Sequence, residues 1–100
     1  MIPLLEYEQI IHIDKDKELT KSTISYALYD AQRHRRYAKF YCGKYYISIT
    51  FNRDNTVQFS SNYRVDTKFR SELDKMDGYK YRLNAVTNFI YYWMNKFRKL

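Results

Sequence analysis

Residues 44–60, KYYISITFNRDNTVQFS, carry the clearest structural pattern in this chain. Large apolar side chains occupy the odd positions from Tyr45 to Phe51, and smaller or more polar ones occupy most even positions. This period of two is typical of a half-buried β-strand. Residues 52–55 have the composition of a turn, and Val57 and Phe59 resume the alternation. The sequence therefore predicts a β-hairpin over about 44–60.

Upstream of the hairpin, residues 22–40 are predicted to form a helix. Ser22 or Thr23 can cap its N-terminus, and several alanines favour helix. At 100° per residue, one face collects the apolar side chains Ile24, Ala27, Leu28, Ala31 and Ala38. The opposite face collects Tyr26, Tyr29, Arg33, Arg36, Tyr37 and Phe40.

Two further helices are predicted downstream, over about 66–77 and 79–98. Asp66 or Thr67 can cap the first, and Gly78 lies just past its end, where a left-handed residue is expected. The second repeats apolar residues at spacings of three and four, namely Leu83, Val86, Ile90, Trp93 and Phe97. Because this stripe covers only two heptads, we interpret it as core packing rather than as a dimer seam.

Residues 2–13 fit two structures. Pro3 suits the first turn of a short helix, whereas Tyr7, Ile11 and Ile13 suit a strand near 7–13, which we favour. The fold class is therefore α+β: a small antiparallel sheet, with or without this N-terminal strand, packed against two or three helices. A chain of 100 residues is expected to form a single domain, residues 1–100.

Composition limits the disulfides, metal sites and cellular location that we expect of this protein. Cys42 is the only cysteine, which excludes an intramolecular disulfide and a cysteine-rich zinc site. We see neither a secretory signal nor an apolar run long enough to span a membrane, and we expect no membrane association and a cytoplasmic location. Lys, Asn, Ile, Tyr and Phe supply 42 residues, all with AT-rich codons. That bias suggests a bacterial or archaeal host, and a phage or mobile element as the source.

Positive charge is concentrated in the middle of the chain. Residues 1–31 have a net charge of −3, residues 32–64 of +6 and residues 65–100 of +4. Arginine binds phosphate through paired hydrogen bonds, and tyrosine offers a ring on which bases stack. We therefore expect a basic, tyrosine-rich surface that binds nucleic acid or a nucleoprotein complex without catalysis. The candidate contacts are Tyr26, Tyr29, Arg33, Arg36, Tyr37, Phe40, Lys44, Tyr46 and Arg53.

Such a module could serve as an accessory factor or as a counter-defence inhibitor of a host nuclease, including an RNA-guided one. Two alternatives stay open. Arg33, His34, Arg36 and Tyr37 supply the side-chain types of a small metal-independent ribonuclease of the toxin kind. An acidic protein partner would be attracted by the same positive charge, and Tyr and Arg are favoured at protein interfaces. The sequence does not indicate the oligomeric state.

Other chemistry has little support in the sequence. His12 beside Asp14 lacks an evident nucleophile. Asp14, Asp16 and Glu18 alternate with lysines and lack the glycine of a calcium loop. Cys42 is more simply read as a small buried apolar residue than as a reactive thiol. We accordingly expect no catalytic residues, no metal and no cofactor.

Overall fold

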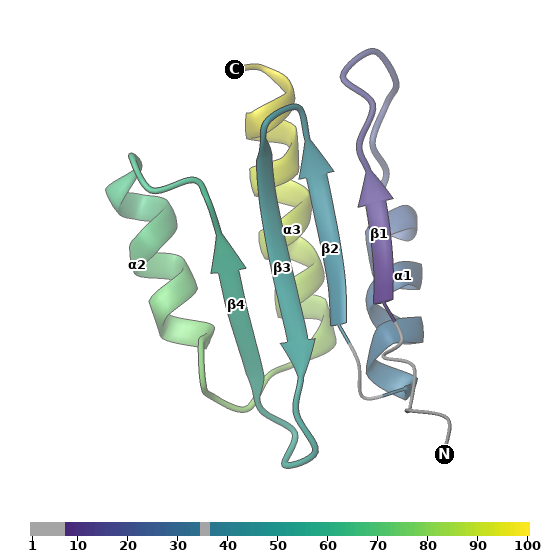
Figure 1. Ribbon diagram of the computed structural model, residues 1–100, viewed down its shortest axis with the longest axis vertical. Helices are drawn as coiled ribbons and strands as arrows, with labels where there is room; N and C mark the ends of the chain where they lie inside the picture. The colour runs from purple at the N-terminus through teal and green to yellow at the C-terminus, as the bar shows by residue number, and fades with distance from the viewer. Residues whose placement is uncertain (1–7, 35–36) are drawn as a thin grey trace, which may run out of the picture.

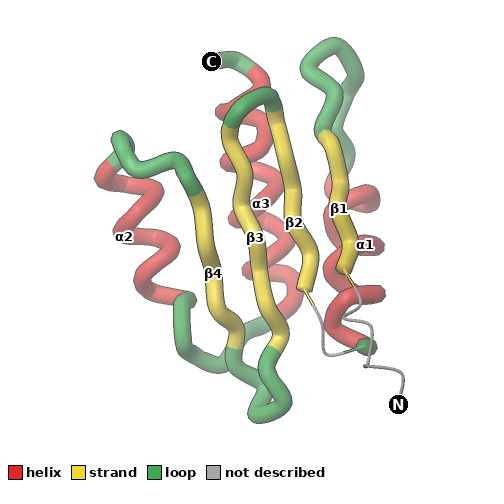
Figure 2. The backbone as a smooth tube through the Cα atoms, in the orientation of Figure 1, coloured by secondary structure: helices red, strands yellow, loops and turns green. Residues whose placement is uncertain are grey.

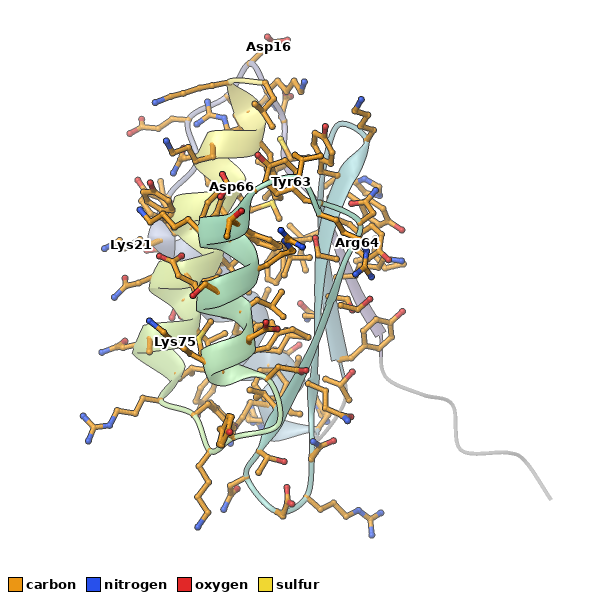
Figure 3. The ribbon with its side chains drawn as sticks, turned by 90° about the vertical axis from the view of Figure 1, so that its left-hand side faces the viewer. Asp16, Lys21, Tyr63, Arg64, Asp66 and Lys75 are labelled. Atoms are coloured by element: carbon orange, nitrogen blue, oxygen red, sulfur yellow. The ribbon has the colours of Figure 1, made fainter. Side chains whose placement is uncertain are left out.

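The computed structural model describes residues 8–34 and 37–100. Its element order is β1 (Glu8–His12), α1 (Lys21–Arg33), β2 (Tyr37–Cys42), β3 (Tyr45–Phe51), β4 (Val57–Ser61), α2 (Thr67–Met76) and α3 (Leu83–Arg98). The four strands form one sheet in the order β1-β2-β3-β4. The three helices lie on one side of it (Figures 1 and 3). The predicted α+β class is confirmed.

The sheet is mixed, so the prediction of an antiparallel sheet was wrong in one respect. β2 pairs antiparallel with β3, and β3 with β4, as expected for a hairpin and its extension. The predicted N-terminal strand exists as β1, but it pairs parallel with β2. Parallel neighbours need a crossover, and α1 supplies it between β1 and β2.

The largest correction concerns the helix predicted over 22–40. α1 ends at Arg33, and residues 37–42 form β2 instead. Ala38, Phe40 and Cys42 are buried, while Tyr37, Lys39 and Tyr41 between them are half-buried. This alternation is the pattern of a strand with one covered face. The helical interpretation failed because alanines at 27, 31 and 38 also satisfy a 3.6-residue period.

Short connections join β2 to β3 and β3 to β4 (Figure 2). Gly43, with φ of 61°, and Lys44 form the two-residue connection between β2 and β3. A positive φ at the first of two turn residues is the type II′ arrangement, which suits the twist of a hairpin and favours glycine. The longer loop between β3 and β4 has Asn55 at φ of 68°.

α2 begins and ends within a residue of its predicted bounds, whereas α3 begins later than predicted. Asp66 caps α2 by accepting a hydrogen bond from the Phe69 N–H at 3.1 Å, and Gly78 follows the helix with φ of 83°. α3 starts at Leu83 rather than at residue 79. Tyr79 and Lys80 instead pair with the backbone around Val57, which keeps them out of the helix.

The core lies between the sheet and the helices. α1 contributes Ile24, Leu28 and Ala31, all fully buried, and packs against α3. The apolar stripe of α3 is core, as predicted. Its Trp93 and Phe97 join Phe69, Tyr63 and Tyr45 in a cluster of contacting aromatic rings. The helices thus cover one side of the sheet, and none of the described residues covers its other side (Figure 3).

Candidate nucleic-acid interface

The uncovered side of the sheet is the face seen in Figure 1, with the helices behind it. We call it the open face. Strand alternation and register assign to it the side chains of Ile10, His12, Tyr37, Lys39, Tyr41, Tyr46, Ser48, Thr50, Gln58 and Ser60. All of these side chains are half-buried or exposed. The residues that alternate with them along each strand face the core.

Three aromatic rings form a row across β1, β2 and β3, at the end of the open face nearest the β2–β3 turn. The strand register sets His12 opposite Tyr41, and Tyr41 opposite Tyr46. The rings of His12 and Tyr41 lie 5.2 Å apart at only 11° to each other, and those of Tyr41 and Tyr46 lie 5.8 Å apart at 51°. Adjacent strands are separated by about 4.8 Å, so one ring per strand produces a continuous row.

A lysine lies against this row. The Lys39 ammonium is 4.3 Å from the centre of the Tyr46 ring and 5.0 Å from that of Tyr41. Both distances are within the range of a cation–π contact. The face therefore combines aromatic surface with a positive charge in one place.

Two side chains at the end of β4, Ser61 and Asn62, fix the backbone of Tyr46. Its N–H donates to Asn62 Oδ1 at 2.9 Å, and its carbonyl accepts from the Ser61 hydroxyl at 2.6 Å. Asn62 also donates to the Lys44 carbonyl at 2.7 Å. These contacts continue the β3–β4 pairing with side chains, so the aromatic row rests on a fixed strand.

Further cations border the aromatic end of the sheet. Lys44 is exposed in the β2–β3 turn, and its ammonium lies 5.3 Å from the ring of Tyr45, which is on the helix side of the sheet. Arg64 is exposed in the segment after β4 and lies on the sheet side in Figure 3, away from Lys75. Its neighbour Tyr63 is buried between sheet and helices. Arg64 and Val65 are both exposed, so the chain leaves the core directly after Tyr63.

The structure brings only some of the nine predicted contacts together. Tyr37 and Tyr46 lie on the open face, and Lys44 borders it. Arg53 is exposed in the β3–β4 loop, at the opposite end of β3 from Lys44. Arg36 lies outside the described residues.

Phe40 is a clear correction. Its side chain is fully buried, because it alternates with Lys39 and Tyr41 on β2 and faces the helices. The expectation that Phe40 belongs to a binding surface is therefore wrong.

Tyr26, Tyr29 and Arg33 form a separate surface on α1, on the helix side of the molecule. Tyr26 is 79% exposed and Tyr29 is 54% exposed. The Arg33 guanidinium lies 5.9 Å from the centre of the Tyr29 ring. A shallow groove between α1 and α3 runs beside the two tyrosines and includes Asn84 and Asn88. The sheet separates this surface from the open face, so the single tyrosine–arginine face predicted over 26–40 is two surfaces.

The four residues considered for a ribonuclease site lie close together in sequence, and one of them, Arg36, is outside the described part of the chain. Arg33 and His34 end α1, where His34 Nε2 lies 3.8 Å from Asp30 Oδ1, whereas Tyr37 begins β2. Asp14 Oδ1 accepts a hydrogen bond from the Asp16 N–H at 2.8 Å, as in an ordinary turn. Within residues 8–34 and 37–100 there is no cluster of three side chains suited to a metal ion.

Cys42 has the environment of a core residue. Its side chain is 1% exposed, and burial raises the pKa of the thiol, although Lys15 and Arg98 oppose that shift. A raised pKa leaves little of the reactive thiolate at neutral pH.

Three residues of the aromatic end were missing from the predicted contacts: His12, Lys39 and Tyr41. The signal that could have found them is the alternation in residues 37–42, YAKFYC, which places Tyr37, Lys39 and Tyr41 on one face of a strand. His12 could not be found in this way, because its place beside Tyr41 depends on the parallel pairing of β1 with β2.

None of the helices in the described part of the chain has the length and apolar character needed to cross a bilayer. Comparison of the chain with protein families, with curated proteins and with solved structures gives no match, so the interpretation of the open face depends on its own geometry.

Proposed function

We propose that this protein is a non-enzymatic nucleic-acid-binding module whose contact surface is the open face of the sheet. The observation that carries the proposal is the row of His12, Tyr41 and Tyr46 with Lys39 lying against it. Aromatic rings beside a cation are the combination that nucleic-acid surfaces use for bases and phosphates.

The charge of the molecule supports this proposal. The net charge is +7, which favours association with a polyanion. Lys44 and Arg64 are exposed and lie at the same end of the sheet as the aromatic row.

A binding assay with matched charge variants tests the proposal. Labelled DNA and RNA oligonucleotides, single- and double-stranded, are titrated with the protein and followed by fluorescence anisotropy over a series of salt concentrations. The parent protein is expected to bind at least one of them, with an affinity that falls as salt rises. Lys39→Gln should weaken binding several-fold and reduce the log–log salt slope by about 1.

Lys75→Gln is the matched control, because Lys75 is exposed on α2, on the helix side. It makes the same change in net charge, so it should reproduce only the part of the effect that comes from the overall field. No binding by the parent even at about 50 mM salt would refute the proposal. Equal effects of the two variants would remove the open face as the contact surface.

A further inference from the structure

The shape of the open face says which form of nucleic acid it suits, provided that the proposed function holds. We propose that the ligand is a single-stranded nucleic acid. Its unpaired bases stack on the aromatic row, and the hydrogen-bonding edges of those bases contact the polar side chains of the open face toward β4. The proposal excludes a base-paired duplex as the preferred ligand.

The first argument is accessibility. The bases of a duplex are reached only through its grooves, and the major groove admits a helix or a two-stranded ribbon. The rings of His12, Tyr41 and Tyr46 are set within a sheet of four strands, and all three helices lie behind it (Figure 1). Against such a face a duplex can offer only phosphates and sugars, and the aromatic row would have no partner. Unpaired bases can extend the row at its ends, in the way that His12 already stacks on Tyr41.

The second argument is the distribution of chemistry over the face. The rings are on β1, β2 and β3, whereas the side chains toward β4 are hydroxyls and an amide: Ser48, Thr50, Gln58 and Ser60. These groups both donate and accept hydrogen bonds, as the edges of unpaired bases require. Half of the face is therefore suited to stacking and the adjoining half to polar contacts with the same strand.

The third argument is charge. Lys39 is the one lysine or arginine among the described side chains of the face from Ile10 to Ser60, although Lys44 and Arg64 border it. Proteins that hold a duplex through its backbone use about 6–10 phosphate contacts and show steep salt dependence. With so few cations on the face, stacking must supply much of the affinity. We expect a log–log salt slope of magnitude about 2 rather than about 6.

The test compares three ligands of one length: a single strand, the same strand in a duplex, and the same strand with its central nucleotides made abasic. The abasic strand keeps the phosphates and loses the bases. Anisotropy titrations, in DNA and RNA versions, are expected to show the intact single strand binding at least about tenfold tighter than the other two. Tyr41→Leu and Tyr46→Leu should reduce that preference, and Tyr46→Phe should keep it because the ring remains.

Tyr26→Leu is the matched control, since Tyr26 is exposed on α1 on the other side of the sheet. Unfolding in urea establishes that each variant is folded. Equal affinity for intact and abasic strands, or tighter binding of the duplex, would overturn the inference while leaving nucleic-acid binding in place. Loss of the preference in Tyr26→Leu but not in Tyr46→Leu would also overturn it. Failure of all three ligands to bind would instead refute the proposed function.

Discussion

At the scale of single residues, alternation along β2 separates side chains of opposite roles. Phe40 is buried under the helices, and its neighbours Lys39 and Tyr41 face outward. A shift of the pairing by one residue would exchange the two sets, which is why a buried face fixes strand register strongly. The exposure of the aromatic row therefore depends on the burial of Ala38, Phe40 and Cys42.

Asp77 is a single residue that joins two elements, and its removal should destabilise the fold. Its Oδ1 accepts a hydrogen bond from the Phe59 N–H at 2.7 Å, which occupies the outer edge of β4. Asp77→Ala leaves that N–H to water, because the contact is exposed, and is expected to cost about 0.5–1.5 kcal/mol of unfolding free energy. Urea denaturation measures the loss.

Asp77→Asn keeps an acceptor oxygen and should retain most of the stability, whereas Asp74→Ala removes a nearby exposed carboxylate of α2 as a control. If Asp77→Ala and Asp74→Ala were equally stable, the contact to β4 would contribute nothing measurable.

At the scale of elements, α3 holds the core together. Its apolar stripe was predicted from sequence, because five apolar residues repeat at helical spacing over residues 83–97. The structure adds the partners of that stripe. The Phe97 ring lies 4.7 Å from Tyr63, 5.3 Å from Tyr45 and 6.2 Å from Phe69, measured between ring centres. One residue of α3 thus contacts β3, α2 and the segment between β4 and α2.

Phe97→Ala should therefore be severely destabilising. Emptying a fully buried phenylalanine site costs about 3–5 kcal/mol, which is a large part of the stability of a domain of this size. Tyr92→Ala, on the same helix but 40% exposed, should cost much less. Thermal and urea unfolding followed by circular dichroism compare the two, and similar losses would contradict the packing described for Phe97.

β2 is the element that sequence analysis missed, and the reason is physical. Residues 22–40 fit a helical period through their alanines, and residues 37–42 also fit a strand period. Local preference cannot decide between them, because pairing with neighbouring strands supplies the energy that favours the strand. Those partners are β1 and β3, and β1 is separated from β2 by the whole of α1.

At the scale of the whole molecule, the burial of two ionisable side chains makes the folded protein less stable at alkaline pH. Desolvation raises the pKa of the Cys42 thiol, and desolvation followed by the nearby Asp66 carboxylate raises the pKa of the Tyr63 hydroxyl. In the unfolded chain both groups lose their protons at lower pH than in the folded protein. The folded state then binds more protons at alkaline pH, so its stability falls as pH rises.

The protonated Cys42 thiol is expected to make its full contribution to the free energy of unfolding below about pH 8, where thiols of an unfolded chain begin to ionise. Above that pH the contribution should decline. Urea midpoints of the parent should fall between pH 8 and pH 10. Cys42→Ala should be less stable at pH 7 because it creates a small cavity, yet its midpoint should fall less steeply with pH. Parallel pH profiles would show that the thiol makes no such contribution.

The candidate interface also belongs to the scale of the whole molecule. Sequence analysis placed Tyr26, Tyr29, Tyr37 and Phe40 on one helix face, whereas the structure distributes them over α1, the open face and the core. The basic, aromatic character of the region was visible in the residues themselves. Which rings share a surface was not, because His12, Tyr41 and Tyr46 become neighbours only through the pairing of three strands.

Local patterns were thus sufficient for the β3–β4 hairpin, for the ends of α2 and for the buried stripe of α3. In each case the partners lie close in sequence, or one face of a single element carries the signal. The parallel β1–β2 pair and the open face required the tertiary structure. Their free energy comes from contacts between distant segments, and no window of sequence contains both sides of those contacts.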